Sequence, residues 1–157
     1  MDCAEPGGHV SGDAPGDDEG GAGYVLDDQI GYLLRLATQR HVAIFQAHSP
    51  AELTPTQFST LIRLSEAGEV SQNRLGRLAG LDGATIKGVV ERLRARGLIS
   101  ARPDPQDKRR ALWSLTAQGR SLAADLPAMG GRITRDTAAP LSPAEARHLV
   151  RLLRKIT

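Results

Sequence analysis

The 157-residue chain is long enough for one folded domain, and its hydrophobic fraction of 40% and charged fraction of 24% are ordinary for a globular protein. A single cysteine, Cys3, excludes an intramolecular disulfide framework and a cysteine-based metal site. We predict no membrane span, because no apolar run approaches about 18 residues. The opening MDCAEPGGHV lacks the basic and apolar parts of a secretory signal, so we expect a cytoplasmic protein.

The net charge of +2 is the sum of two oppositely charged parts. Residues 1–23 hold six of the 18 acidic residues and no lysine or arginine, so the remaining residues carry +8. The segment is rich in Gly, Asp and Pro, which predicts a disordered acidic tail. The simplest interpretation is a solvated terminus, and the alternative is competition with nucleic-acid phosphates. The basic remainder indicates a polyanionic partner.

Two helices are predicted first. Residues 27–48 carry an amphipathic stripe with steps of four and three: Ile30, Leu34, Ala37, His41, Ile44 and His48. Thr54-Pro55-Thr56-Gln57 then has the pattern of a capping box with proline in the first turn, so it begins a second helix that ends near Gly68.

A short helix, a tight turn and a longer helix follow. The short helix starts at Ser71, the turn covers residues 81–83, and Asp82 caps the longer helix, which ends near Arg96. One strand is predicted to begin at Leu98. A second strand is predicted over residues 111–115, where the side chains alternate with a period of two. The polar residues 103–110 join these strands as a loop.

Two helices close the chain. Thr116 caps the first, which carries Leu122, Leu126, Met129 and Ile133 on one side. Pro127 and Gly130-Gly131 predict a kink or break in it. Ser142-Pro143-Ala144-Glu145 is a second capping box, and it begins a helix that runs to about Lys155.

A short helix and a longer helix joined by a turn is the helix-turn-helix arrangement, whose second helix enters the DNA major groove. Residues 71–120 contain eleven basic and four acidic side chains, as expected for phosphate neutralisation. Small residues at the start of the longer helix permit close approach to a duplex, and Thr85 is expected to donate to it. The candidate DNA contacts in the two helices are Gln72, Asn73, Arg77, Ala84, Thr85, Lys87 and Arg92. The alternative for each single charge is an ordinary solvated helix face.

The loop between the strands is strongly basic at its tip. Asp107, Lys108, Arg109 and Arg110 are candidate DNA contacts, because the negative potential of a minor groove attracts inserted arginine. Asp107 is expected to hold the Arg109 guanidinium by a bidentate pair. The alternative is a turn that is charged without binding anything.

These segments together resemble the multiple antibiotic resistance regulator (MarR) family of winged-helix repressors. The resemblance is carried by Gly97-Leu98-Ile99, the Asp107-Lys108-Arg109 wing and Leu115-Thr116-Ala117-Gln118-Gly119, with a matching helix order over residues 27–157. It implies a mainly α fold with a small β-hairpin wing, in which residues 24–157 form a single domain. Residues 24–50 and 117–157 would be dimerisation helices, and residues 51–116 the winged helix-turn-helix DNA-binding part.

The resemblance also implies a homodimer on a pseudopalindromic double-stranded DNA operator and a small aromatic or phenolic effector. Residues 31–41 look like family members tied to aromatic-compound catabolism. The candidate ligand residues are Arg35, Thr38, Arg40, His41, Phe45 and Phe58. An arginine there could pair with a ligand carboxylate. The alternative is a hydrogen-bonded interface histidine and surface arginines.

Three other functions are less well supported by the residues. A zinc-responsive regulator of the same fold needs converging ligands, and His41, His48 and His148 show no such spacing, so we predict no metal site and no cofactor. A non-specific architectural DNA-binding protein would show little preference among sequences. An enzyme is not expected, because phosphate-binding glycine loops, G-x-S-x-G and H-E-x-x-H are absent.

Overall fold

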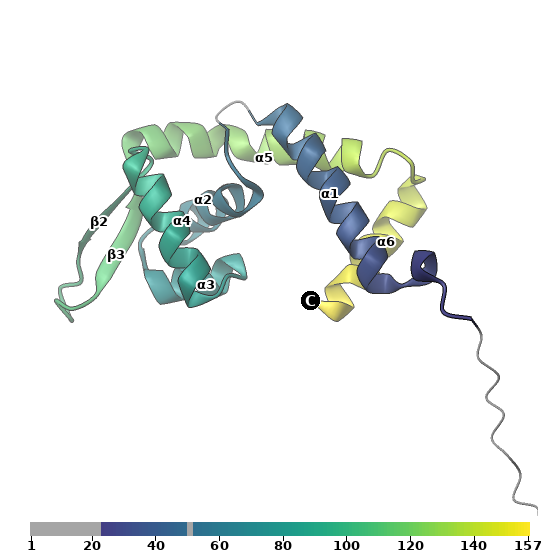
Figure 1. Cartoon of the computed structure of the whole chain (residues 1–157). Coiled ribbons are helices and arrows are strands. Elements are labelled where there is room, and N and C mark those ends of the chain that lie inside the picture. Colours follow the sequence, from purple (N-terminus) through teal and green to yellow (C-terminus); the bar gives the residue numbers. More distant parts are fainter. Residues whose placement is uncertain (1–22, 50–51) are drawn as a thin grey trace, which may run out of the picture.

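The computed structural model describes residues 23–49 and 52–157 and is mainly helical (Figure 1). Its elements are η1 (Leu26–Asp28), α1 (Ile30–His48), α2 (Pro55–Ala67), β1 (Val70–Ser71), α3 (Gln72–Ala79), α4 (Gly83–Ala95), β2 (Ile99–Pro103), β3 (Ala111–Leu115), α5 (Ala117–Thr137) and α6 (Pro143–Ile156). The predicted fold class is confirmed. The tail predicted over residues 1–23 lies outside the described residues except for Gly23. None of the described helices combines the length and the apolarity that a membrane crossing requires.

The long helix α5 connects two parts of the molecule (Figure 1). Helices α2, α3 and α4 and the β2–β3 ribbon gather at the N-terminal part of α5. Helix α1 crosses α5 nearer its C-terminal end, and α6 folds back beside that C-terminal end. Both α1 and α2 pack against α5. The part with α2–α4 and the ribbon corresponds to the predicted DNA-binding region.

The helix starts follow the predicted caps. Thr54 and Ser142 each form a complete capping box with a Gln or Glu three residues later. Asp82 and Thr116 accept hydrogen bonds from the backbone N–H groups of Thr85 and Gly119. Each side chain satisfies a backbone donor that the first helical turn leaves unpaired.

The sheet has one strand more than predicted. Its order is β1-β3-β2, with both pairs antiparallel, and Ile99 lies opposite Leu115. The added strand β1 has only two residues, and Val70 pairs with Trp113. A two-residue strand has no detectable alternation, so its pairing depends on tertiary packing rather than on local pattern.

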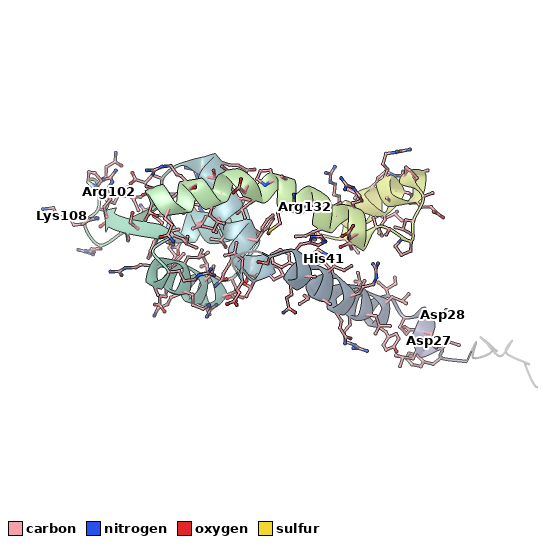
Figure 2. The ribbon with its side chains drawn as sticks, turned by 90° about the horizontal axis from the view of Figure 1, so that it is seen from above. Asp27, Asp28, His41, Arg102, Lys108 and Arg132 are labelled. Atoms are coloured by element: carbon pink, nitrogen blue, oxygen red, sulfur yellow. The ribbon has the colours of Figure 1, made fainter. Side chains whose placement is uncertain are left out.

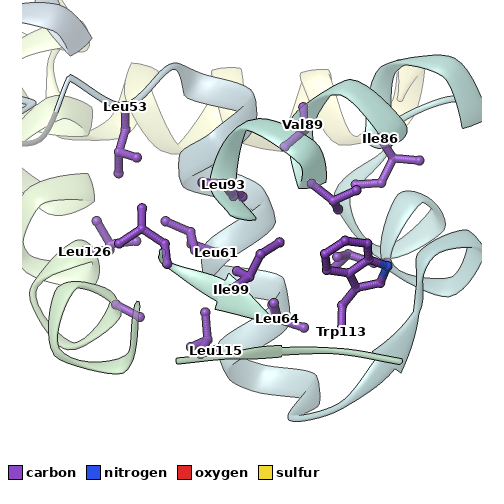
Figure 3. Packing of buried hydrophobic residues seen from close by; sticks show 14 of the residues in the cluster. Leu53, Leu61, Leu64, Ile86, Val89, Leu93, Ile99, Trp113, Leu115 and Leu126 are labelled. Atoms are coloured by element: carbon purple, nitrogen blue, oxygen red, sulfur yellow. The ribbon is translucent and has the colours of Figure 1, made fainter. Parts of the chain in front are cut away.

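The core is built mainly from aliphatic side chains, and Trp113 packs at one side of them (Figure 3). Leu61 and Leu64 of α2, Ile86 of α4 and Leu126 of α5 are at most 1% exposed, and Trp113 of β3 is 6% exposed. These residues come from helices on one side and the sheet on the other, so the helix-turn-helix is fixed to the wing and to α5 by burial of apolar surface.

Helix α5 is continuous, so a break at Pro127 and Gly130-Gly131 is wrong, whereas the alternative of a kink there stays a prediction. Pro127 lies on the exposed side, while Leu126, Met129 and Ile133 are buried on the other side. This packing against α1 and α2 offsets the backbone hydrogen bond that proline cannot donate.

The first helix also differs from its prediction. A 3₁₀ turn precedes α1, which starts at Ile30 rather than at residue 27. Only Phe45 of α1 is buried, and Ile30 at the start of the predicted apolar stripe is 71% exposed. No residue of α6 is buried either. Much of the apolar surface of these two helices is therefore exposed in the described chain, although the C-terminal part of α1 packs against α5.

Candidate nucleic-acid interface and ligand pocket

The turn between α3 and α4 holds the two helices close together. Gly80 ends α3 with φ of 66°, a conformation that glycine adopts without steric cost. At Gly76 an added Cβ would lie 3.1 Å from the Leu81 carbonyl oxygen and 3.2 Å from Cγ2 of Ile86. The sequence therefore fixes the direction in which α4 leaves the turn.

The N-terminus of α4 is exposed at Gly83 and Ala84, as expected of a helix that approaches a duplex. Asp82 accepts from the backbone N–H and from the hydroxyl of Thr85, both at 2.8 Å. These hydrogen bonds stabilise the charged carboxylate and hold the pKa of Asp82 below its ordinary value. In this structure the Thr85 hydroxyl proton, which was expected to donate to DNA, is engaged by Asp82, and the hydroxyl oxygen retains its acceptor capacity.

The start of α3 and the C-terminal side of the wing loop form a polar groove of about 290 Å³. Its lining residues are Ser71, Gln72, Asn73, Arg109, Arg110 and Ala111. Four of the predicted DNA-contact residues thus converge from segments more than 30 residues apart. The backbone N–H groups of a helix N-terminus and two guanidinium groups together are suited to an anion such as a phosphate.

The wing tip is shaped by its two aspartates. Asp104 accepts from the backbone N–H of Gln106 at 2.9 Å, and Asp107 accepts from the backbone N–H of Arg109 at 3.0 Å. The predicted ion pair between Asp107 and the Arg109 guanidinium is wrong, because that carboxylate instead closes a local turn, as Asx side chains commonly do. Lys108 and Arg109 remain exposed at the tip.

An ion pair that the sequence analysis missed fixes the base of the wing. Arg102 of β2 binds both carboxylate oxygens of Glu69, which precedes β1, and the Nε to Oε1 distance is 2.7 Å. The Glu69 carboxylate raises the pKa of Arg102 above its ordinary value. A planar guanidinium meeting a carboxylate at two points restricts orientation as well as distance, so this pair positions the wing relative to α2.

The remaining predicted DNA residues are exposed on the helix-turn-helix. Arg77 and Lys87 are exposed on α3 and α4. Arg92 folds back along α4 toward Gly88, so that a Cβ added to Gly88 would lie 3.3 Å from Nη1 of Arg92. Figure 2 places Arg102 and Lys108 at one end of the molecule and Asp27 and Asp28 at the other. The end that carries the wing therefore presents basic side chains.

A second, smaller pocket of about 160 Å³ lies where α1, α2 and α5 meet. Its lining residues are His41, Phe45, Pro55, Phe58, Gly130, Ile133 and Thr134. Phe45 and Phe58 pack edge to face with ring centroids 5.5 Å apart, and His41 is 6.4 Å from Phe45. His41, Phe45 and Phe58 were candidate ligand residues. The three α5 residues were missed, although their spacing of three and four places them on one helix face.

The other candidate ligand residues make different contacts. Arg40 donates to the backbone carbonyls of Asp136 and Thr137 at the end of α5, at 3.1 and 2.6 Å. The Arg35 guanidinium lies 5.0 Å from the centre of the Tyr32 ring. Thr38 is exposed. Within the chain described, none of Arg35, Thr38 and Arg40 lines the pocket, so their role as ligand residues stays a prediction.

The two histidines of α1 connect it to the end of α5. Nδ1 of His41 lies 3.0 Å from Oγ1 of Thr137, and Nε2 of His48 lies 2.6 Å from a carboxylate oxygen of Asp136. Figure 2 shows His41 at this crossing. Among the described residues no three His, Cys, Asp or Glu side chains lie close enough to hold a metal ion.

The comparisons with known proteins agree with this architecture. Residues 51–110 match the MarR family model. The chain is 40% identical over 134 residues to the HTH-type transcriptional repressor NicR of Pseudomonas putida, and the match covers 85% of each chain.

Two solved structures are close in fold and sequence. A probable transcriptional regulator from Pseudomonas aeruginosa is 49% identical with a TM-score of 0.81, covering 85% of this chain and all of that one. Bordetella bronchiseptica BpsR, whose DNA binding is regulated by 6-hydroxynicotinic acid, is 42% identical with a TM-score of 0.80, covering 85% and 96%. The chain therefore belongs to the MarR family of DNA-binding transcriptional regulators.

Proposed function

We propose that this protein is a homodimeric, sequence-specific repressor that a small aromatic acid releases from double-stranded DNA. The observation that carries the DNA-binding part is the groove in which Gln72 and Asn73 of α3 meet Arg109 and Arg110 of the wing. A duplex phosphate in this groove would bind the helix and the wing at once. The phosphate contact would set the position of α4 in the major groove and of the wing tip in the adjoining minor groove.

Direct reading of bases is assigned to the start of α4. Ala84 is small and exposed, so it can contact a thymine methyl, and Thr85 offers its hydroxyl oxygen as an acceptor. Lys87 and Arg92 on α4 and Arg77 on α3 are assigned to phosphates or base edges near it. Lys108 and Arg109 are assigned to the minor groove, with Asp107 shaping the turn that presents them.

The dimer is assigned to η1, α1, α5 and α6, within residues 24–50 and 117–157. Exposed large apolar side chains recur on residues 24–26, on α1 and on α6: Tyr24, Val25, Leu26, Ile30, Leu33, Leu34, Leu36, Leu149, Val150, Leu152 and Ile156. So many exposed large apolar side chains on neighbouring helix turns favour an interface between proteins. Two chains would thereby present two α4 helices to two half-sites of a pseudopalindromic operator.

The effector is assigned to the pocket lined by His41, Phe45 and Phe58. Its volume of about 160 Å³ lies below the roughly 300–1,000 Å³ of sites for drug-sized ligands, which favours a compact ligand. Two phenylalanine rings favour an aromatic ligand, and His41 offers a ring nitrogen to a carboxylate. The similarity to BpsR, which 6-hydroxynicotinic acid regulates, supports the same ligand class here.

The proposal is tested by fluorescence anisotropy of a labelled duplex taken from upstream of the chain's own gene. We expect tight binding, release by 6-hydroxynicotinic acid or another one-ring aromatic acid, and no release by zinc. Release by zinc alone would favour the metal-responsive alternative. Equal affinity for a scrambled duplex would favour a non-specific architectural protein.

Replacement of His41 by alanine is expected to weaken the effector response while DNA affinity without effector stays near that of the wild type. A lost hydrogen bond to a charged ligand group corresponds to about tenfold or more in ligand affinity. Isothermal titration with 6-hydroxynicotinic acid measures this change. His148→Ala is the matched control, because His148 is exposed on α6 and does not line the pocket. Loss of DNA binding with an unchanged effector affinity would instead make His41 structural.

A further inference from the structure

Gly130 of α5 lies directly against the ring of Phe58 of α2. A Cβ placed on Gly130 would be 3.1 Å from Cζ and 3.8 Å from Cε1 of that ring, and no other neighbouring atom would lie within 4 Å. Both residues line the pocket described above. The missing side chain at residue 130 therefore leaves room for one specific ring in the pocket wall.

The Phe58 ring is also restricted by a second neighbour. Phe58 meets Phe45 edge to face at 86°, with centroids 5.5 Å apart, and Phe45 is 2% exposed in the core. The ring thus contacts both Gly130 and a buried aromatic neighbour. A methyl group at residue 130 would displace the ring by a few tenths of an ångström, and the methyl itself would join the pocket wall.

The backbone does not require glycine at residue 130. The described glycines with positive φ are Gly68, Gly80 and Gly97, and Gly130 lies within the regular helix α5. Glycine inside a helix is destabilising relative to alanine. Gly131 has the same backbone setting, but no neighbouring atom would lie within 4 Å of a Cβ there. Substitution of either glycine by alanine changes helix propensity in the same way, but only the substitution at Gly130 changes packing against Phe58.

We propose that Gly130 is a specificity-determining residue that sets the size of the pocket through the position of the Phe58 ring, and that it limits the effector to an acid with one aromatic ring. This inference rests on the proposed function, because it assigns the effector to the same pocket. A pocket of about 160 Å³ has little spare volume, so a single added methyl group removes room that a six-membered ring needs.

The test is isothermal titration of 6-hydroxynicotinic acid into the wild-type protein, Gly130→Ala and Gly131→Ala. We expect Gly131→Ala to bind like the wild type and Gly130→Ala to bind roughly tenfold more weakly or worse. Both variants are checked by thermal unfolding and by DNA affinity without effector. Wild-type affinity in Gly130→Ala overturns the inference, and so does an equal loss in both variants.

Phe58→Leu provides a second test, and its ligand-size readout does not depend on the folding of Gly130→Ala. The shorter side chain is expected to admit a two-ring acid, 2-naphthoic acid, that the wild type excludes, and to make the added Gly130→Ala change nearly neutral. Exclusion of 2-naphthoic acid by Phe58→Leu counts against the inference. Failure of the wild type to bind any one-ring acid removes the effector part of the proposed function. If the wild type binds a one-ring acid but neither Gly130→Ala nor Phe58→Leu changes ligand binding, this inference fails while the proposed function stands.

Discussion

Replacement of Gly119 by alanine is expected to destabilise the fold by about 3 kcal/mol or more. Gly119 is buried in the first turn of α5, and an added Cβ would lie 1.9 Å from the Leu98 carbonyl oxygen and 2.9 Å from its carbonyl carbon. Both obstacles are backbone atoms, so no side-chain rotation relieves the overlap. Thr116 also donates from its backbone N–H to the same Leu98 oxygen at 3.1 Å, and a shift of α5 would strain that bond.

Thermal unfolding followed by circular dichroism measures the effect, which corresponds to a fall in Tm of roughly 6–12 °C. Gly131→Ala is the matched control in the same helix, because nothing lies within 4 Å of its added Cβ. We expect this control to be neutral or to stabilise by up to about 1 kcal/mol. A Gly119→Ala protein as stable as the wild type would show that the first turn of α5 does not lie against the Leu98 backbone in the way described.

Replacement of Arg109 by alanine is expected to lower the affinity for the operator and to make that affinity less sensitive to salt concentration. Arg109 is exposed at the wing and lines the groove with Gln72 and Asn73. If its guanidinium neutralises a phosphate or enters a minor groove, the slope of log K against log salt should fall by about one for each chain. We expect the greatest loss at sites where the minor groove is narrow, because the negative potential there is strongest.

Arg147→Ala is the control for this experiment, since it removes the same charge from an exposed position on α6. That helix lies at the end of the molecule away from the wing (Figure 1). Anisotropy titrations at several salt concentrations measure both variants. Unchanged affinity of Arg109→Ala at every site, or an equal loss in Arg147→Ala, would contradict the assignment of the wing to DNA.

Much of the fold was predictable because its signals are local. Thr54, Asp82, Thr116 and Ser142 begin helices where their side chains satisfy backbone N–H groups, and this depends on only three or four neighbouring residues. The change from helical to alternating periodicity located the ribbon that contains Trp113. Such features are encoded within a single turn or strand.

The features that were missed depend on contacts across the chain. Pro127 indicates a break locally, but burial of Leu126 and Ile133 against other helices keeps α5 intact. Glu69 meets Arg102 across 33 residues, and no local pattern identifies that pair. The wing aspartate Asp107 was assigned to a guanidinium, whereas a backbone N–H two residues away is the nearer donor.

The candidate sites divide in the same way. The basic segment on α3, α4 and the wing was recognisable from composition and spacing, and four of its residues do converge in one groove. The pocket was only partly recognisable, because Gly130 looks like a helix breaker in the sequence. Its role in the pocket depends on its contact with Phe58, which lies 72 residues earlier. Arg40 looked like a carboxylate partner, but it binds the carbonyl groups at the end of α5.

In the proposed function, two chains together present α4 and the wing to a duplex and read its sequence. The most direct measurement is a stoichiometric anisotropy titration of the upstream duplex and a scrambled duplex over a range of salt concentrations. We predict two chains per site, an affinity at least about 10³-fold above that for the scrambled duplex, and a linear fall of log K with log salt. One chain per duplex, equal affinity for both duplexes or insensitivity to salt would contradict the claim.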